Sequence, residues 1–124
     1  MQKNTLKITF TGDLLSLLPQ NKASFNKKDN SYDYTPVFDK ITYLLNNSDY
    51  VVGNLETPIA GEDLGYTYLP TVFNTPIEFL YAIKNAGFDF VSIANNHCLD
   101  RQLEGLNKTI ENIEKTGLDR KSVG

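Results

Sequence analysis

The chain has 124 residues, of which 40% are hydrophobic, so it is long enough for one domain with a core and gives no reason to expect a second. Its net charge of −3 at pH 7 provides no basic face for a phosphate backbone, which argues against nucleic acid as a partner. The single cysteine, Cys98, excludes an internal disulfide and a thiolate cage for a metal.

The N-terminal part of the chain begins with a strand pattern. Residues 1–4 are polar and show no apolar export signal or transmembrane segment, so the expected location is the cytoplasm. Residues 6–11 alternate between apolar and polar types and predict a strand that ends at a turn containing Asp13. Residues 19–34 are rich in Asn, Lys, Ser and Asp, which predicts a surface loop whose lysines form a solvated face.

A helix and a second strand follow this loop. Thr35 is suited to cap a helix over residues 36–46, because a proline follows it and apolar residues recur at helical spacing. Residues 50–54 form a short apolar run rich in β-formers, which predicts a strand. Like the first strand, it is followed by a carboxylate, Glu56.

The next segment combines an irregular stretch with a helix. Residues 59–70 contain turn-forming glycines, and the tyrosines among residues 66–68 fit packing and pocket lining equally well. Thr75 and Glu78 match a capping box, so we expect a second helix to begin there. Gly87 is the expected left-handed residue at its end.

The third strand is predicted within residues 88–97, an apolar run that ends at two amides and the only histidine, His97. Asp100 is then expected to cap a third helix, which ends at Gly117. The order β-α-β-α-β-α with short connections predicts an α/β fold, in which helices flank a parallel sheet and the crossovers are right-handed.

Three polar motifs stand at the carboxyl ends of these strands. In a parallel sheet every strand presents this end to the same edge, so Asp13, Glu56, and Asn96 with His97 are predicted to converge there. Two carboxylates, an amide and an imidazole form a hard donor set that suits Mn²⁺, Mg²⁺, Fe²⁺ or Zn²⁺. In a two-metal hydrolase Glu56 would be the bridging carboxylate, and His97 would donate a proton to the leaving group.

Each residue also has a purely structural interpretation. Asp13 could cap a helix that starts at residue 14, and Glu56 and Asn54 could be turn residues without a ligand. His97 could be a structural imidazole, although its position beside an amide at a strand end favours function. Cys98 is expected to be a packed small side chain rather than a nucleophile.

At these motifs the sequence resembles the bacterial capsule synthesis CapA family, which is linked to poly-gamma-glutamate production and related to calcineurin-like metallophosphoesterases. The resemblance rests on three segments, namely Thr11-Gly12-Asp13, Gly53-Asn54-Leu55-Glu56-Thr57-Pro58, and the run from Ala86 to Asp100 with Ala94-Asn95-Asn96-His97-Cys98-Leu99-Asp100 as its most specific part. It implies a parallel half of a metallophosphoesterase-like sheet.

The resemblance also implies roles for individual residues. Asp13 and Glu56 would bind a divalent metal, Asn96 would complete a metal shell, and His97 would act as the acid or stabilise the transition state. The supporting residues would be Asn54, Asn95 and Asp100. The implied partners are an anionic polymer or a phosphoester substrate, and a membrane-bound synthesis complex with which the chain would associate.

Some features depart from the phosphoesterase pattern. Leu15 stands where that pattern has a histidine ligand on the first strand, a difference that the CapA family shares. Gln102 stands where the family commonly has a glycine, and no histidine follows His97. The resemblance covers residues 6–118, so we expect an N-terminal part of a truncated domain over 1–118 and a non-native tail over 119–124, the fragment being inactive alone.

Two functional hypotheses follow from these observations. The first is a metal-dependent hydrolase of capsule or poly-gamma-glutamate synthesis that acts on a phosphoester or an amide bond. The alternative is a non-catalytic assembly or polymer-binding component with a degenerate metal site, which Leu15 supports. A flavodoxin-like nucleotide-binding module is a weaker third hypothesis, because neither a GxGxxG motif nor a P-loop is present.

Overall fold

The computed structural model describes residues 4–121, which form one four-stranded sheet, a small hairpin and the helices that pack on them. The strands are β1 (Ile8–Leu14), β2 (Phe25–Asn26), β3 (Ser31–Tyr32), β4 (Tyr50–Leu55), β5 (Phe90–Ser92) and β6 (Asp119–Lys121). The helices are α1 (Leu18–Ser24), α2 (Thr35–Phe38), α3 (Thr42–Leu45), α4 (Glu78–Ala86) and α5 (Gln102–Thr116), with a 3₁₀ turn η1 at Glu62–Leu64.

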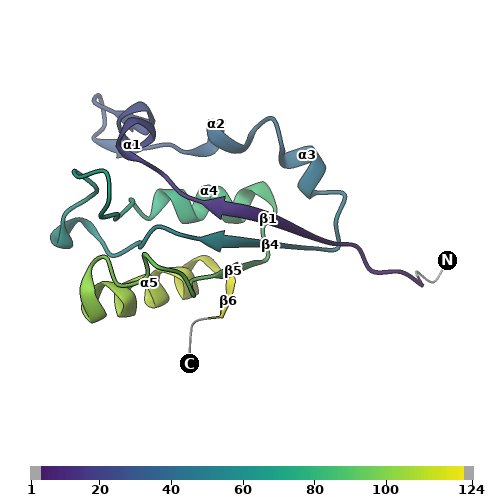
Figure 1. Cartoon of the computed structure of the whole chain (residues 1–124). Helices are drawn as coiled ribbons and strands as arrows, with labels where there is room; N and C mark the ends of the chain where they lie inside the picture. Colours follow the sequence, from purple (N-terminus) through teal and green to yellow (C-terminus); the bar gives the residue numbers. More distant parts are fainter. Residues whose placement is uncertain (1–3, 122–124) are drawn as a thin grey trace.

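The main sheet is entirely parallel and confirms the predicted fold class. Its strands pair in the order in which they occur along the chain, β1-β4-β5-β6. The arrowheads of β1 and β4 point toward the same edge (Figure 1), as the pairing requires. The carboxyl ends of the strands therefore meet at one edge, where ligand sites of open α/β sheets lie.

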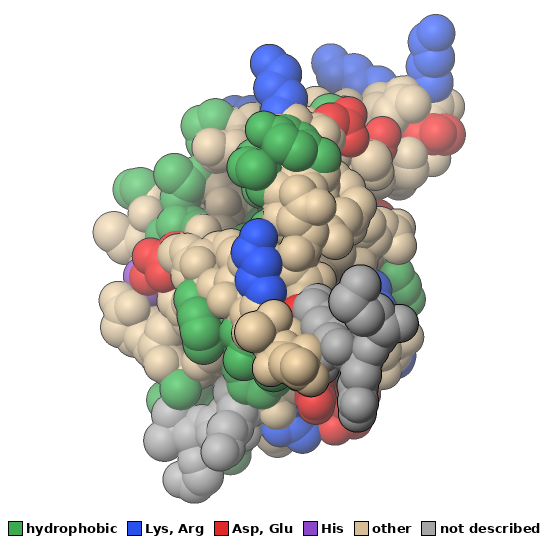
Figure 2. Space-filling view, turned by 90° about the vertical axis from the view of Figure 1, so that its right-hand side faces the viewer, with side chains coloured by type: hydrophobic (Ala, Val, Ile, Leu, Met, Phe, Trp, Pro, Cys, Tyr) green, Lys and Arg blue, Asp and Glu red, His purple; other side chains and the backbone are tan. Residues whose placement is uncertain are grey.

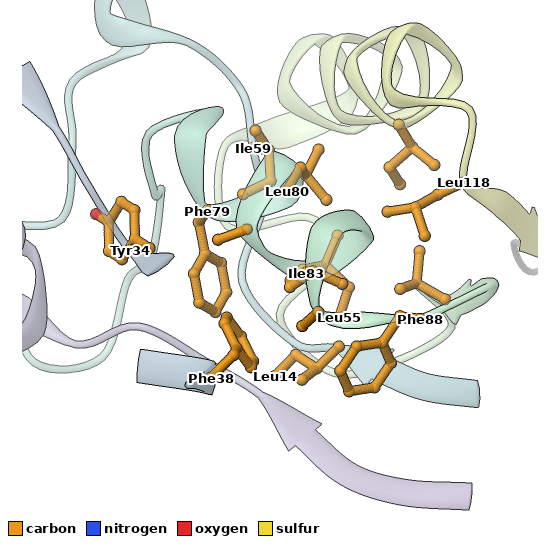
Figure 3. Packing of buried hydrophobic residues seen from close by; sticks show 14 of the residues in the cluster. Leu14, Tyr34, Phe38, Leu55, Ile59, Phe79, Leu80, Ile83, Phe88 and Leu118 are labelled. Atoms are coloured by element: carbon orange, nitrogen blue, oxygen red, sulfur yellow. The ribbon is translucent and has the colours of Figure 1, made fainter. Parts of the chain in front are cut away.

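One face of the sheet packs against the helices and forms the core. Residues of β4 alternate between buried and half-buried, and Val51 and Leu55 point into the buried side. Helix α4 packs on that side through Leu80 and Ile83, both fully buried (Figure 3). The apolar spacing of α4 thus explains its place at the centre of the core.

The opposite face of the sheet is only partly covered. Phe10 of β1 pairs with Val52 of β4, which pairs with Phe90 of β5, so the three lie in one row across the sheet. Phe10 is 73% exposed and Ile8 44%, whereas Val52 and Phe90 are half-buried. Among the described residues, the helices α4 and α5 do not cover this row.

Strand β1 extends beyond its predicted end and contains an irregularity. Phe10 pairs with Val52 but Asp13 pairs with Asn54, so three residue steps in β1 match two in β4. This is a β-bulge, which re-aims the side chains that follow it. The expected turn at Asp13 was therefore wrong, since Asp13 lies within the strand.

Residues 19–34 do not form a plain surface loop, and this prediction was wrong. They contain α1 and an antiparallel hairpin in which Phe25 pairs with Tyr32. The rings of these two residues lie 5.1 Å apart, and Tyr34 next to the hairpin is buried. Aromatic residues spaced along a polar segment thus supply its packing.

The single helix predicted over residues 36–46 is interrupted and forms α2 and α3 instead. The Thr42 hydroxyl donates a hydrogen bond of 2.9 Å to the carbonyl of Phe38, and the amide of Ile41 donates to the same carbonyl. A threonine hydroxyl competes in this way with regular helical bonding. Phe38 and Leu45 are the buried residues of the two short helices.

The three predicted N-terminal caps were wrong. Thr35 lies inside α2, and its amide donates to Asp33, while α4 begins after Ile77 without a side-chain cap. The Thr75 hydroxyl instead pairs with the Thr57 hydroxyl at 2.8 Å in the buried interior. Asp100 likewise does not cap α5, whose N-cap residue is Arg101.

The predicted helix ends were confirmed. Gly87 closes α4 with φ 114° and Gly117 closes α5 with φ 77°, both in the left-handed region that glycine adopts without a steric penalty. Gln102, at the start of α5, also has a positive φ of 61°. This is the position at which the resembled family commonly has a glycine.

The C-terminal segment continues the sheet. Strand β6 pairs in parallel with β5, and residues 122–124 lie outside the described residues, so the non-native tail stays a prediction. The strand predicted within residues 88–97 is shorter than its apolar run and covers Phe90–Ser92. None of the helices in residues 4–121 has both the length and the apolar composition that crossing a bilayer requires.

Charged side chains are interspersed on the face shown in Figure 2. Lys and Arg lie among Asp and Glu there rather than in one large basic patch. This matches the slightly acidic balance of the whole sequence.

Candidate functional site

The carboxyl ends of β1 and β4 bring two carboxyl groups together. Asp13 and Asn54 are paired residues of these strands, and the Asn54 amide donates a 2.8 Å hydrogen bond to Asp13 Oδ1. Glu56 follows β4 directly, and its backbone amide donates to the carbonyl of Leu14 at 3.1 Å. This bond extends the contact between the strands and holds Glu56 beside Asp13.

The pKa values of the two carboxyl groups shift in opposite directions. The hydrogen bond with Asp13, together with partial burial and the nearby negative charge, raises the pKa of Glu56 above its ordinary value. The hydrogen bonds from Asn54 and Glu56 lower the pKa of Asp13. Glu56 therefore takes up a proton more readily than Asp13 does, because two adjacent carboxyl groups do not both ionise readily.

His97 lies against this pair. Its Nε2 is 3.9 Å from Glu56 Oε1, and its Nδ1 is 2.8 Å from Asp100 Oδ2. The His97 and Asp100 side chains are 18% and 12% exposed, so the ring is held in a mostly buried position. A carboxylate on Nδ1 fixes the orientation of the ring and leaves Nε2 free to face Glu56.

Asp100 holds a second group as well as the histidine. The same Oδ2 accepts a 2.8 Å hydrogen bond from the backbone amide of Phe73. The Phe73 ring packs on the His97 ring with a centroid distance of 4.4 Å. Asp100 and Phe73 together therefore confine the imidazole from two sides.

Asn95 connects the segment after β5 to the end of β4. Its amide donates to Asn54 Oδ1 at 3.1 Å and to the carbonyl of Leu55 at 2.9 Å. Its side-chain oxygen accepts from the backbone amide of His97 at 3.0 Å. Asn95 thus sets the position of His97 relative to Asn54, and through Asn54 relative to Asp13.

The structure therefore brings together most of the predicted residues but not all. Those joined by the contacts above are Asp13, Asn54, Glu56, Asn95, His97 and Asp100. Asn96 is exposed, and no side-chain hydrogen bond among residues 4–121 involves it. The proposed metal-binding role of Asn96 stays a prediction that these contacts do not support.

A divalent cation fits part of this site. A cation would relieve the repulsion between the adjacent carboxylates of Asp13 and Glu56. However, no group of three or more His, Cys, Asp or Glu side chains within residues 4–121 is arranged to hold a metal ion. The described residues supply two carboxylate ligands and a neighbouring imidazole, and not a complete set of ligands.

Two residues of the surroundings had no signal in the sequence. Phe73 lies in a segment with no helical or strand pattern, and only the structure brings it to His97. Asn74 is fully buried, and its side chain bonds to the amide of Ala60 and the carbonyls of Gly61 and Gly65. Asn74 thereby holds the irregular segment that carries Phe73.

Other interpretations of single residues can now be assessed. Asp13 does not cap a helix, because β1 continues to Leu14 and α1 starts at Leu18. Cys98 is a free, half-buried thiol. Leu15 is half-buried and carries no metal-binding atom, so the position that holds a histidine in the phosphoesterase pattern contributes no ligand here.

Comparisons with known proteins cover nearly the whole chain. A family model described as "Bacterial capsule synthesis protein PGA_cap" matches residues 7–123. The "Capsule biosynthesis protein CapA" of Bacillus anthracis is 32% identical over 127 residues, which cover 99% of this chain and 29% of that protein. The "PGA biosynthesis protein CapA" of Bacillus subtilis (strain 168) is 26% identical over 118 residues, covering 94% of this chain and 30% of that protein. The chain thus spans less than a third of the length of these relatives.

Proposed function

The chain belongs to the family of bacterial capsule synthesis proteins described as PGA_cap, and from this membership we propose that it is part of a metal-dependent hydrolase of capsule or poly-gamma-glutamate synthesis. The reaction would be cleavage of a phosphoester or an amide bond. The observation that carries the proposal is the contact of two adjacent carboxyl groups, Asp13 and Glu56, with an imidazole whose Nδ1 is held by Asp100.

In this proposal each residue has a defined task. Asp13 and Glu56 would hold a divalent ion such as Mn²⁺, Mg²⁺, Fe²⁺ or Zn²⁺, which when bound lowers the pKa of water and neutralises charge on the substrate. His97 Nε2 would deliver a proton to the leaving group, while Asp100 keeps the ring oriented. Asn54 and Asn95 would keep the carboxyl pair and the imidazole in register.

The proposed partners follow from the family as well. They are an anionic polymer or a phosphoester substrate, and a membrane-bound synthesis complex, with this part of the protein in the cytoplasm. Nucleic acid is not among them, given the net charge of −3.

A turnover assay tests the proposal. A full-length protein carrying this chain is incubated with Mn²⁺ and bis(4-nitrophenyl) phosphate, or with a poly-gamma-glutamate oligomer, beside the variants Asp13→Ala and His97→Ala. We expect metal-dependent release of product that falls at least about a hundredfold in each variant, the scale of a lost general acid. Metal-dependent turnover that both variants retain would show that the catalyst lies elsewhere.

A second function is favoured by one observation. Because the described residues offer no three-ligand group and Leu15 provides no donor, the protein could act without turnover as an assembly or polymer-binding component. In that case the full-length protein binds the polymer equally well with and without Mn²⁺ and releases no product. Loss of polymer binding on chelation would contradict this second function.

A further inference from the structure

A pocket of about 460 Å³ lies between α1, the β2–β3 hairpin and the segment at Tyr66. Aromatic rings form one of its walls. The Phe25 and Tyr32 ring centroids are 5.1 Å apart, and those of Tyr32 and Tyr66 are 5.8 Å apart, so the rings support one another. A concave site with a preformed aromatic wall is suited to an apolar ligand body.

Asn21, whose side chain is almost wholly buried, also lines this pocket. Asn21 is only 5% exposed, and its Oδ1 accepts from the hydroxyls of Ser16 and Tyr34, each at 2.7 Å. Its Nδ2 has no acceptor among residues 4–121. The bonds from the two hydroxyls therefore hold the Asn21 side chain in place beside the pocket.

The charged residues of the pocket lining itself are basic, while the carboxylates of Glu62 and Glu78 lie near its Tyr66 wall. Lys22 and Lys27 are exposed residues of its lining, and none of the described residues that line it is acidic. Burial raises the pKa of Tyr66 to about 12, so its hydroxyl remains protonated and can donate a hydrogen bond. Ammonium and phenol groups are donors, and they favour a ligand whose anionic acceptor lies beside the lysines.

The pocket adjoins the surroundings of His97. Leu18 and Thr67 line both this pocket and a second one of about 260 Å³, whose lining includes Phe73. The Phe73 ring packs on His97. A ligand longer than the first pocket would therefore extend toward the candidate site.

We propose that this pocket binds a carboxylic acid with an apolar body, whose carboxylate is attracted by Lys22 and Lys27 at the rim. The aromatic wall would contact the body of the ligand. Binding of this kind requires neither a metal nor turnover, so it goes beyond the proposed function and can hold even if that function fails.

An NMR titration of the ¹⁵N-labelled chain tests the proposal with two matched probes. One is 4-phenylbutyrate, and the other is its uncharged analogue 4-phenylbutanamide. We expect saturable shifts of the Asn21 side-chain amide and of residues 21–32 with the acid, and binding at least about fivefold weaker with the amide. Equal binding of both probes, or no saturable shift in this segment, would overturn the proposal.

Charge variants give an independent test. Exchanging both rim lysines, Lys22→Gln with Lys27→Gln, should weaken binding of the acid about fivefold and leave the amide unaffected, the scale expected for two exposed charges. The matched control exchanges Lys40 and Lys115, which are exposed and lie outside the pocket lining, for Gln. An equal loss of affinity in the control would show that the acid responds only to overall charge.

Discussion

Asp100 fixes the orientation of the His97 ring and the position of the segment beside it. Asp100 Oδ2 accepts from both the imidazole Nδ1 and the amide of Phe73, each at 2.8 Å. Since the two donors share one acceptor, removing it affects the ring and the neighbouring backbone at once. Asp100 is therefore more than a partner of the histidine, because it also fixes the segment that packs on the ring.

Asp100→Ala should destabilise the protein by about 1–3 kcal/mol, because two partly buried donors lose their acceptor. Urea unfolding measures this change, and the nuclear Overhauser effects between the His97 and Phe73 rings should weaken in parallel. Asp100→Asn retains an acceptor oxygen and should lose less. Asp39→Ala, an exposed site, is the control and should change stability by less than about 0.5 kcal/mol.

Asp13→Asn should lower the pKa of Glu56. The raised pKa of Glu56 comes mainly from its hydrogen bond with Asp13 and from partial burial, and an asparagine amide would instead donate to the ionised glutamate. Carboxyl ¹³C shifts followed by NMR between pH 2 and pH 8 measure the change. An unchanged Glu56 titration in the variant would show that the two groups do not interact.

The site residues differ in how far the sequence predicts them. Asp13, Glu56 and His97 each follow or end a strand pattern, so the parallel topology alone predicts that they meet. Phe73 reaches His97 through the backbone bond to Asp100, a contact between residues 27 positions apart that no local pattern encodes. Asn96 is the opposite case. The local motif predicts it as a site residue, but its side chain is exposed.

At the scale of elements, the start of α5 holds a strained residue. The backbone of Gln102 has φ 61°, a conformation that residues other than glycine rarely adopt. Gln102→Gly should therefore stabilise the protein by about 0.5–1 kcal/mol, measured as a higher urea midpoint. Gln20→Gly, at an exposed position inside α1, is the control and should destabilise by a similar amount.

The packing between β1 and β4 depends on a glycine. A Cβ atom at Gly53 would lie 2.7 Å from Leu14 Cδ1 and 3.0 Å from Phe88 Cε1, both core side chains. Gly53→Ala should cost about 1–3 kcal/mol of unfolding free energy, since the core has to shift. Gly12→Ala is the control, because nothing lies within 4 Å of its Cβ position. Equal losses for the two variants in thermal unfolding would refute the steric explanation.

Element boundaries were predictable where a single residue decides them. Gly87 and Gly117 end their helices because the left-handed conformation is a local property of glycine. The hairpin within residues 19–34 was missed because its stability comes from ring contacts with Tyr66, far away in the sequence. The predicted helix over 36–46 was broken by a bond between the Thr42 side chain and the backbone, which apolar spacing does not reveal.

At the scale of the whole molecule, the two faces of the sheet are unequal. The core gathers on one face, while Phe10 on the other is 73% exposed on an edge strand. Exposed apolar side chains on an unpaired edge promote association between molecules. The parallel topology was predictable from the order of the elements, but the imbalance between the faces was not, because alternation in β1 does not tell which face is covered.

Phe10→Lys should therefore reduce self-association of the chain with little loss of stability. The expected change in unfolding free energy is below about 0.5 kcal/mol, because the side chain is mostly in solvent already. Sedimentation velocity over a range of concentrations measures the association. Tyr43→Lys, at a residue of α3 that is 64% exposed, is the control and should leave the association unchanged.

The bulge in β1 decides on which side of the sheet the Asp13 side chain emerges. With regular pairing, residue 12 would face Asn54 and Asp13 would face Leu55, on the side that forms the core. The inserted residue turns the carboxylate outward, beside Asn54. Straightening this one kink would separate the carboxyl pair, and it would also place the Asp13 carboxylate in the core, where Leu14 now lies. The geometry of the site and the packing of the core thus depend on the same irregularity of one strand.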